Sequence, residues 1–325
     1  MSEAISTADH YNQYYQDTVR LERGCDMGLP VDEVYQQEAA WSLKACGVDA
    51  SYFQPGEGIL DIASGAGNHV KHMNQLLGRT VAIDGVDGSE ALIAEANKMK
   101  TEIAQSEVHN EIAFYVGDMA KISELKLDKT RYKLITILGS SFCYLNKAKT
   151  KKALHDLYNK LEPGGKIVVQ YRAKDQNPTA EMIKNLEAGK AKLHMKTTTR
   201  EINGKATELY TDETNKDSVY EYQVDCPLPD QENPQEYTQI QREGEDVLRY
   251  ADTDGIQYKS FGRVYIDSEG VEHQLAPTMV NWFLGEDTFP VTKKVMEEAG
   301  FQDVEMKTCP KRMGTTKIIA ITATT

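Results

Sequence analysis

Long apolar runs and paired cysteines are both absent from this chain of 325 residues. No run reaches the roughly 18 apolar residues that a membrane-spanning helix needs, and residues 1–8 lack the apolar stretch of a signal peptide. The five cysteines are scattered and include no CxxC pair, which excludes a zinc site built from thiolates and argues against a disulfide framework. We therefore expect a cytoplasmic protein without a membrane partner.

Basic residues are scarce relative to acidic ones. The chain has 37 lysines and arginines against 50 aspartates and glutamates, so its formal net charge is −13. Because an excess of negative charge repels a phosphate backbone, we expect no nucleic-acid partner. The 40% hydrophobic and 27% charged residues are typical of a globular protein, and the length suits one α/β core with an elaborate insertion.

Strand and helix patterns alternate between residues 58 and 172, as is typical of βαβ units around a parallel sheet. The predicted strands are Gly58–Ala63, Thr80–Val86, Ile112–Val116, Tyr132–Leu138 and Lys166–Tyr171. The predicted helices among them are His69–Leu77, Ser89–Gln105 and Thr150–Leu161. This pattern predicts an α/β fold with a Rossmann-like, doubly wound sheet.

The two ends of the chain are expected to complete this core. Residues 1–57 are predicted to form a mainly helical lid, with a helix over Val31–Cys46 that begins after Pro30. Residues 276–325 are predicted to return to the core, with a helix over Pro290–Ala299 and a closing strand over Lys317–Thr322.

Residues 173–275 follow a different pattern and are predicted to form an inserted, antiparallel β-rich cap. A predicted helix, Pro178–Lys192, is followed by an Asn-Gly hairpin signal between Ile202 and Lys205. Tyrosine-rich strand patterns follow, among them Ser218–Val224, Gly255–Lys259 and Gly262–Ile266. The region has 21 acidic and 12 basic residues, so it carries most of the net negative charge. An edge of such a sheet could also pair two copies into a homo-oligomer.

One predicted core strand runs into a turn of small residues that opens a helix. Its sequence is Ile59-Leu60-Asp61-Ile62-Ala63-Ser64-Gly65-Ala66-Gly67-Asn68-His69. Glycines in such a turn let the backbone approach a ligand closely. The dinucleotide fingerprint has a third glycine that is missing here. Asp61 would repel a pyrophosphate but suits a cationic ligand.

Three further strand ends carry matching residues. Asp87 lies 22 residues after Gly65, where an acid can accept hydrogen bonds from two ribose hydroxyls; Asp84, inside the strand, is the weaker candidate. Asp118 and Met119 follow the third strand, and a Pro-Gly-Gly loop precedes the fifth. Any one of these acids is more often a helix cap or a turn residue. Four such elements in one order point to a shared ligand.

Together these motifs resemble those of class I S-adenosylmethionine-dependent methyltransferases. The resemblance implies that Asp118 binds the adenine amine and that Met119 lies against the ring. It implies S-adenosyl-L-methionine as the cofactor, bound by Asp61, Ala63, Ser64, Gly65, Gly67, Asp87, Gly88, Ser89, Asp118, Met119 and Leu138.

The segment after the fourth strand indicates which kind of methyltransferase to expect. Nucleic-acid amino-methyltransferases carry a (D/N)PP(Y/F) motif there, which this chain lacks. The residues Leu138-Gly139-Ser140-Ser141-Phe142-Cys143-Tyr144-Leu145 instead resemble glycine N-methyltransferase and the bacterial glycine/sarcosine N-methyltransferases. Three other stretches extend that resemblance: Asp9-His10-Tyr11 with Tyr15, Gln170-Tyr171-Arg172, and Phe289–Phe301.

This closer resemblance implies a substrate site. Tyr11, Tyr15 and Ser140 would shape it, and Arg172 would bind a substrate carboxylate. Ser140 stands where those enzymes have asparagine, and residues 173–275 are longer than their corresponding segment, so the substrate is less defined than the reaction. The tyrosines could equally be packing residues at helical spacing, and Arg172 could form a surface ion pair.

The expected function is therefore the SN2 transfer of a methyl group to a small amine, an amino acid of the glycine/sarcosine type. His69 and His72 are expected to be helix residues, because no third ligand for a metal is evident. Two alternatives stay open. One is an O-, S- or C-methyltransferase of a natural-product pathway, and the other is a protein that binds S-adenosylmethionine without catalysis.

Overall fold

The computed structural model describes most of the chain that follows residue 30. Tyr11, Tyr15 and the predicted helix Pro178–Lys192 lie outside the described residues. The described ranges are 31–78, 81–104, 111–174, 195–202, 205–212, 218–241, 247–266, 271–281, 288–310 and 316–325.

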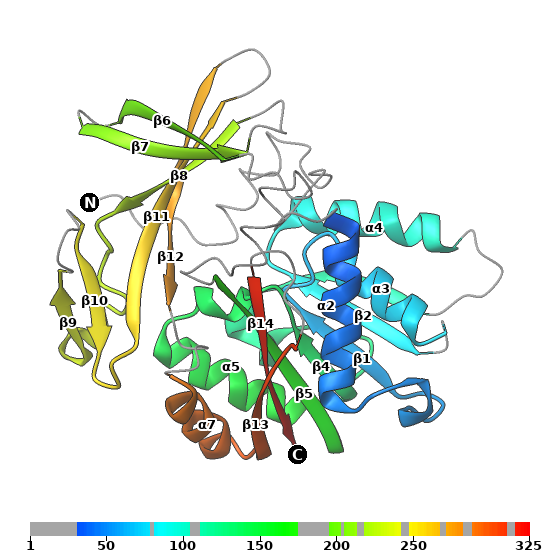
Figure 1. The fold of residues 1–325 in the computed structure, drawn as a ribbon. Helices are drawn as coiled ribbons and strands as arrows, with labels where there is room; N and C mark the ends of the chain where they lie inside the picture. The colour runs from blue at the N-terminus through cyan, green and yellow to red at the C-terminus, as the bar shows by residue number, and fades with distance from the viewer. Residues whose placement is uncertain are drawn as a thin grey trace.

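Seven strands form the core sheet (Figure 1). In order across the sheet they are β13 (Gln302–Thr308), β14 (Thr316–Thr324), β5 (Leu161–Lys174), β4 (Tyr132–Ile137), β1 (Gly58–Ile62), β2 (Ala82–Asp87) and β3 (Ile112–Val116). The pairs formed among β1 to β5 are all parallel, whereas β14 runs antiparallel to both β5 and β13. The predicted Rossmann-like, doubly wound sheet is thereby confirmed.

Helices cover both faces of this sheet (Figure 1). They are α2 (Val31–Cys46), α3 (Asn68–Leu76), α4 (Glu90–Ala104), α5 (Lys147–Lys160) and α7 (Phe289–Glu298), with short 3-10 turns η1 (Ala50–Tyr52), η2 (Met119–Glu124), η3 (Ser141–Tyr144) and η4 (Pro234–Glu236). The predicted helix over Val31–Cys46 is found with the same bounds. Among the described residues, no helix is long and apolar enough to cross a membrane.

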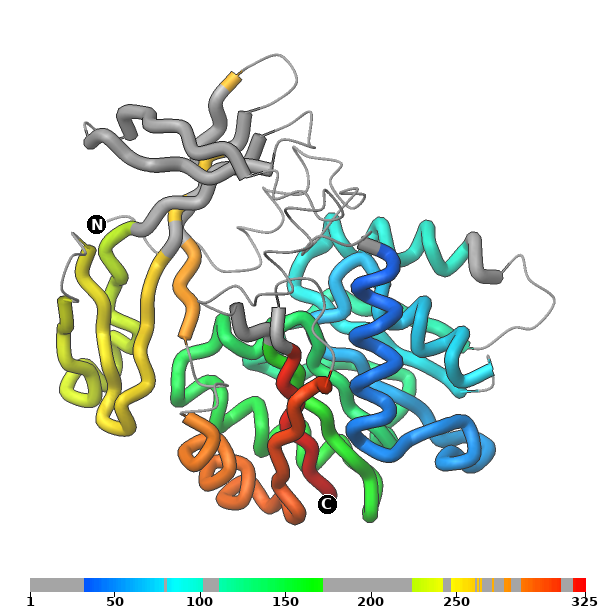
Figure 2. The backbone as a smooth tube through the Cα atoms, in the orientation of Figure 1, coloured from blue at the N-terminus to red at the C-terminus, as the bar shows by residue number. Residues whose placement is uncertain are grey.

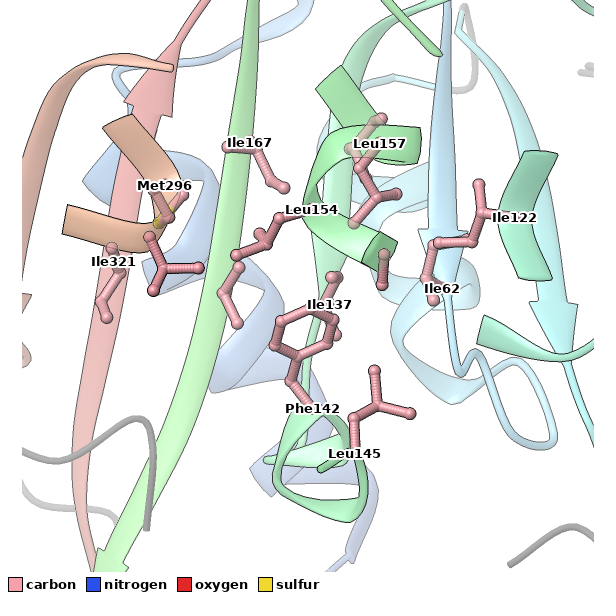
Figure 3. Packing of buried hydrophobic residues seen from close by; sticks show 14 of the residues in the cluster. Ile62, Ile122, Ile137, Phe142, Leu145, Leu154, Leu157, Ile167, Met296 and Ile321 are labelled. Carbon is pink, nitrogen blue, oxygen red and sulfur yellow. The ribbon is translucent and has the colours of Figure 1, made fainter. Parts of the chain in front are cut away.

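Alternating strand residues build one apolar layer on each face of the core sheet. Ile59 of β1 belongs to the apolar cluster that includes buried residues of α2 and α3, whereas its neighbour Leu60 belongs to the cluster that includes buried residues of α5 and α7. Figure 3 shows the second layer, in which Leu154 and Leu157 of α5 lie among strand residues. Because successive strand residues point to opposite faces, an unbroken apolar run predicts a sheet that is covered on both sides.

Among the described residues, a second sheet contains seven strands, and every pair in it is antiparallel. Its order is β6 (Met195–Ile202), β7 (Lys205–Asp212), β8 (Ser218–Val224), β11 (Gln257–Ile266), β10 (Arg249–Asp252) and β9 (Tyr237–Ile240), with β12 (Glu272–Asn281) also paired to β11. Figure 2 shows its strands β9 and β10 to the left of the core sheet. The antiparallel sheet predicted within residues 173–275 is therefore present, and its last strand runs on to Asn281.

Two strand predictions need correction. The patterns Gly255–Lys259 and Gly262–Ile266 belong to one strand, β11, because Gly262 pairs with Tyr222 of β8 and does not interrupt that ladder. The strand predicted over Lys166–Tyr171 is longer, since β14 pairs with β5 up to Lys174.

The two sheets share one apolar core. Cys226, Tyr237, Ile256 and Tyr258 of the second sheet region are buried in the cluster that α5 and the core strands form. Polar contacts join the same regions: Lys147 at the start of α5 forms an ion pair with Asp254. The Asn146 amide also donates a hydrogen bond of 3.0 Å to the Pro229 carbonyl. This junction holds the lower part of the second sheet in a defined position beside the core.

The Leu154→Ala variant tests the layer that joins α5 to the sheet. Leu154 is 1% exposed within the large cluster, so we expect the free energy of unfolding to fall by about 2–5 kcal/mol through lost burial and a residual cavity. Urea unfolding measures it. Leu76→Ala is the control, because Leu76 is 45% exposed and should cost under about 0.5 kcal/mol. Equal losses in the two variants would contradict the packing described here.

Candidate functional site

The candidate site lies where the strand order of the core sheet reverses. From β1 the chain proceeds to β2 and β3 on one side, and β4 and β5 lie on the other. In open α/β sheets, ligands bind outside the carboxyl ends of the strands at this point. The loops that follow β1, β2 and β4 meet here, and they contain most of the residues predicted to bind the cofactor.

Asp61 is the central acid of the site. It is 1% exposed, and its strand neighbours in register are Gly85 of β2 and Thr136 of β4. The Thr136 hydroxyl donates a hydrogen bond of 2.6 Å to Asp61 Oδ1, whereas Asp61 Oδ2 is buried and has no hydrogen-bond partner. A buried acceptor without a donor is costly in a folded protein. A ligand that brings a cationic donor would satisfy it.

Burial raises the pKa of the Asp61 carboxyl to about 6, from its ordinary value of 3.8. The charge of His69 and the hydrogen bond from Thr136 lower this pKa, and the charge of Asp87 raises it. The carboxylate is thus poorly stabilised by the protein alone. A cationic group bound beside it would favour the ionised form.

The loop after β1 is held in an unusual backbone conformation. Ala63 has a φ of 56°, which is uncommon for a residue with a Cβ, and Gly65 and Gly67 have φ values of 57° and 83°. The Ser64 amide donates to the Val86 carbonyl at 2.9 Å, which ties this loop to β2. The Ser64 hydroxyl is buried without a partner. The loop therefore offers a second polar group that lacks a hydrogen bond.

Asp87 joins the first two loops. Its Oδ2 accepts a hydrogen bond of 2.9 Å from the Gly65 amide, and its Oδ1 accepts one of 2.8 Å from the Ser89 amide. Gly88 lies between these contacts in the chain. Burial raises the pKa of Asp87, and the hydrogen bonds from Ser89 and Gly65 lower it. Each carboxylate oxygen keeps a further lone pair, so the acid can also accept ribose hydroxyls.

Asp84 has a different position, as the sequence indicated. It is 5% exposed inside β2, and it accepts a hydrogen bond of 2.6 Å from the buried Tyr132 hydroxyl. Asp84 therefore has a structural partner within the sheet, and Asp87 is the acid at the strand end.

Asp118 and Met119 lie beside Asp87 at the end of β3. The Gly117 amide donates to the Asp87 carbonyl at 2.9 Å, which places the third loop against the second. Asp118 is exposed and caps η2, since its Oδ1 accepts a hydrogen bond of 2.8 Å from the Ala120 amide. Met119 is half-buried against the core. The cap does not prevent the other carboxylate oxygen from binding a ligand.

The loop after β4 is shaped by two successive left-handed residues. Gly139 and Ser140 both have a φ of 66°, and a non-glycine residue in this region is strained. Leu138 is 2% exposed, and its carbonyl accepts a hydrogen bond of 3.0 Å from the Ser141 hydroxyl. Ser140 thus lies in the loop that follows β4, on the side of the core sheet where the candidate site is.

Gln170, on the neighbouring strand β5, binds this loop. No role for Gln170 was predicted from the sequence. It is fully buried in β5, and its Oε1 accepts a hydrogen bond of 3.1 Å from the Gly139 amide. Its Nε2 is buried and has no hydrogen-bond partner. A polar side chain that directly follows the apolar run Ile167-Val168-Val169 is the signal that could have identified it.

Of the four residues predicted to shape the substrate site, the side chain of only Ser140 is described. Tyr11 and Tyr15 lie outside the described residues. Arg172 is described as a backbone position of β5, paired in register with Ile318 of β14. Their roles, and those of the cofactor residues, remain predictions.

His69 lies in α3, as the sequence predicted, and it contacts an acid of a second helix. It lies at the start of α3, is 6% exposed, and its Nε2 is 2.9 Å from Oε2 of the fully buried Glu38 of α2. Glu38 lies four residues from Val34 and from Ser42, which are both buried. An acid in the buried stripe of a helix was the available signal. Among the described residues, no group of three or more potential metal ligands is found.

The comparisons with known proteins agree with this geometry. A model of the methyltransferase domain matches residues 59–165, about a third of the chain. A ubiquinone/menaquinone biosynthesis C-methyltransferase of Vibrio campbellii is 25% identical over 126 residues, which is 38% of this chain and 44% of that protein. The match thus spans less than half of that relative.

Solved structures resemble the chain over almost its full length. The CcbJ methyltransferase of Streptomyces caelestis has a TM-score of 0.57 and 16% identity, and the match covers 99% of this chain and 98% of that one. An S-adenosylmethionine-dependent methyltransferase of Clostridium acetobutylicum has a TM-score of 0.51 and 13% identity, with coverages of 97% and 98%. At these identities the likeness shows the fold.

Residues 59–165 therefore match a methyltransferase domain within a Rossmann-like fold, and S-adenosylmethionine is the methyl donor that this match supports. The site fits this molecule: the unpartnered Asp61 Oδ2 suits its cationic end, and the acceptors of Asp87 suit its ribose. The narrower resemblance to glycine and sarcosine N-methyltransferases finds no support among these relatives.

The Asp61→Asn variant tests the cost of the buried acid. The pKa of Asp61 in the folded protein is above 3.8, so its stabilising contribution is complete below about pH 4 and is lost as pH rises through about 6. We expect the variant to lack this loss, which is of the order of 2–3 kcal/mol. Urea unfolding of the ligand-free protein on both sides of this range measures it. Glu124→Gln, at an exposed acid, is the control. An unchanged pH dependence in Asp61→Asn would contradict the buried charge.

The Asp87→Asn variant tests whether the Asp87 carboxylate binds the ribose hydroxyls of the cofactor. Loss of charge-assisted hydrogen bonds, each worth about 1.5–3 kcal/mol, should weaken S-adenosylhomocysteine binding by at least about tenfold in calorimetry. Asp84→Asn is the matched control on the same strand, and it should change stability while affinity stays the same. The assignment would be wrong if Asp84→Asn weakened binding more than Asp87→Asn.

Proposed function

We propose that the protein is an S-adenosylmethionine-dependent N-methyltransferase that acts on a small amine, an amino acid of the glycine/sarcosine type. The observation that carries this proposal is the polar group of residues at the ends of β4 and β5, next to the buried Asp61. Gln170 holds the Gly139–Ser140 loop there, and its Nε2 is buried without a partner.

The strand geometry supports a carboxylate site in the same place. Residues two apart in a strand share one face of the sheet, so position 172 is on the face of β5 that Gln170 occupies. Arginine binds carboxylates with two parallel hydrogen bonds. A carboxylate held at that position would direct the attached amine toward the β4 loop.

The protein's contribution to such a reaction is mainly positional. Bound S-adenosylmethionine supplies an activated methyl sulfonium, so no covalent intermediate with the protein is needed. Asp61 and Asp87 would hold the two ends of this ligand, and Ser140 would line the space for the acceptor. Holding both reactants in line can supply about 7–11 kcal/mol. The second sheet, joined to the core through α5, would help exclude water.

A second candidate is a small-molecule methyltransferase that acts on oxygen, sulfur or carbon. The relative of Vibrio campbellii carries the name of a C-methyltransferase, and its similarity spans 126 residues of this chain. The cofactor site described here would serve either reaction equally, so the acceptor decides between the two candidates.

The direct experiment is to measure S-adenosylhomocysteine formation with glycine, sarcosine, dimethylglycine and a panel of larger amines. We expect turnover with a small amino acid, and we expect Arg172→Ala to raise the KM for that acceptor at least about tenfold, as the loss of a charge-assisted bond implies. The KM for S-adenosylmethionine should not change.

Two other outcomes would decide against this substrate. Turnover only with amines that lack a carboxylate would contradict the role of Arg172. Binding of S-adenosylmethionine without turnover of any amine would overturn the N-methyltransferase proposal and favour the second candidate or a binding protein.

A further inference from the structure

The pair formed by Glu38 and His69 is a buried acid–imidazole contact beside the methyl-transfer site. Glu38 is fully buried in α2, and its Oε2 is 2.9 Å from His69 Nε2. The Tyr35 ring packs edge-on against the imidazole with a centroid distance of 4.8 Å. Two contacts from α2 thus fix the orientation of the ring.

The imidazole faces the loop that the acceptor is proposed to approach. A Cβ placed at Gly139 would lie 3.8 Å from His69 Cε1, so glycine at this position leaves space in front of the ring. The ring is also close enough to Asp61 for its charge to lower the pKa of that carboxyl. His69 is therefore close to both the buried acid Asp61 and the loop after β4.

The Glu38 contact determines which nitrogen is available for chemistry. A carboxylate that accepts the Nε2 proton of a neutral imidazole holds the ring as the Nε2–H tautomer, which leaves the lone pair on Nδ1. The same logic operates wherever a buried acid orients a catalytic histidine. Cε1, the ring atom nearest to a Cβ built at Gly139, is bonded to both nitrogens, and because Nε2 faces Glu38, Nδ1 is the nitrogen left to accept a proton.

A small amine needs such a base. In water near neutral pH an aliphatic amine carries an extra proton, and a protonated nitrogen has no lone pair with which to attack a methyl group. A group that accepts this proton within the closed site would make the nucleophile available there.

We propose that His69, oriented by Glu38, is the general base that deprotonates the acceptor; this rests on the function proposed above. The proton moves from the acceptor nitrogen to His69 Nδ1. The freed lone pair then forms the bond to the methyl carbon as the carbon–sulfur bond breaks and its electron pair stays on sulfur. His69 later returns the proton to solvent. Glu38 is a positioning residue, because it acts through the imidazole.

His72 provides a matched control on the same helix. It lies one turn after His69 and is 3% exposed, and its Nε2 is 3.1 Å from Asp32 of α2. Asp32 is an exposed acid, and it also accepts a hydrogen bond of 2.7 Å from Lys71. His72→Asn thus removes a histidine–acid contact between the same two helices, away from the β4 loop.

The first test needs no acceptor. Ring-nitrogen NMR of the full chain with labelled histidine, assigned with His69→Asn, should show His69 with a proton on Nε2 and none on Nδ1 at about pH 8. Glu38→Gln should weaken this tautomer preference, and His72→Asn should leave it unchanged. A proton on Nδ1 in the wild-type protein at that pH would overturn the proposal.

The second test uses whichever amine the wild-type protein methylates. His69→Asn should lower kcat by about 10²–10⁴-fold near pH 7, with an unchanged KM for S-adenosylmethionine. The deficit should shrink as pH rises and the free amine becomes abundant. Glu38→Gln should show the same pH trend with a smaller loss, and His72→Asn should retain wild-type kcat.

The results separate the two proposals. A deficit in His69→Asn that is the same at every pH would overturn the role as base and indicate a structural one. If the wild-type protein binds S-adenosylmethionine but methylates no amine, the proposed function fails, and the Nδ1 protonation state alone then decides whether His69 has the form that a base requires.

Discussion

The buried carboxylate of Asp61 is the constraint on which the rest of the site depends. It lies between two parallel strands, receives one hydrogen bond from Thr136, and keeps its other oxygen without a partner. Burial of a charge in this way lowers stability unless a ligand completes its hydrogen bonds. The surrounding loops hold the acid open to a ligand: Ala63 and Ser140 adopt left-handed backbone conformations, and Asp87 and Gln170 bind the amides of these loops.

The two apolar layers of the core sheet make this arrangement possible. One layer attaches α2 and α3, and with them the Glu38–His69 contact, to the face of β1. The other attaches α5 and the second sheet to the opposite face. Packing inside the core therefore holds residues from both halves of the chain in place around the candidate site.

The sequence predicted the core closely because local patterns determine it. The strand over Ile112–Val116 and the helix over Val31–Cys46 are found with the predicted bounds. Gly65 and Asp87, which are 22 residues apart in the sequence, form a hydrogen bond. Contacts between distant segments were not predictable in this way. Glu38 and His69 are 31 residues apart on different helices, and Gln170 and Gly139 are also 31 apart on different elements. The contact of His69 with Glu38 was not predicted because nothing in the local sequence of His69 shows a buried acid beside it.

The most direct test of this account is the pH dependence of S-adenosylmethionine binding to the wild-type chain, measured by calorimetry. If the ligand completes an ionised Asp61, whose pKa is raised to about 6 in the ligand-free protein, affinity should increase from about pH 5 and level off above about pH 7. A measurable affinity that stays constant across this range, or the absence of binding at any pH, would contradict the central place given to this acid.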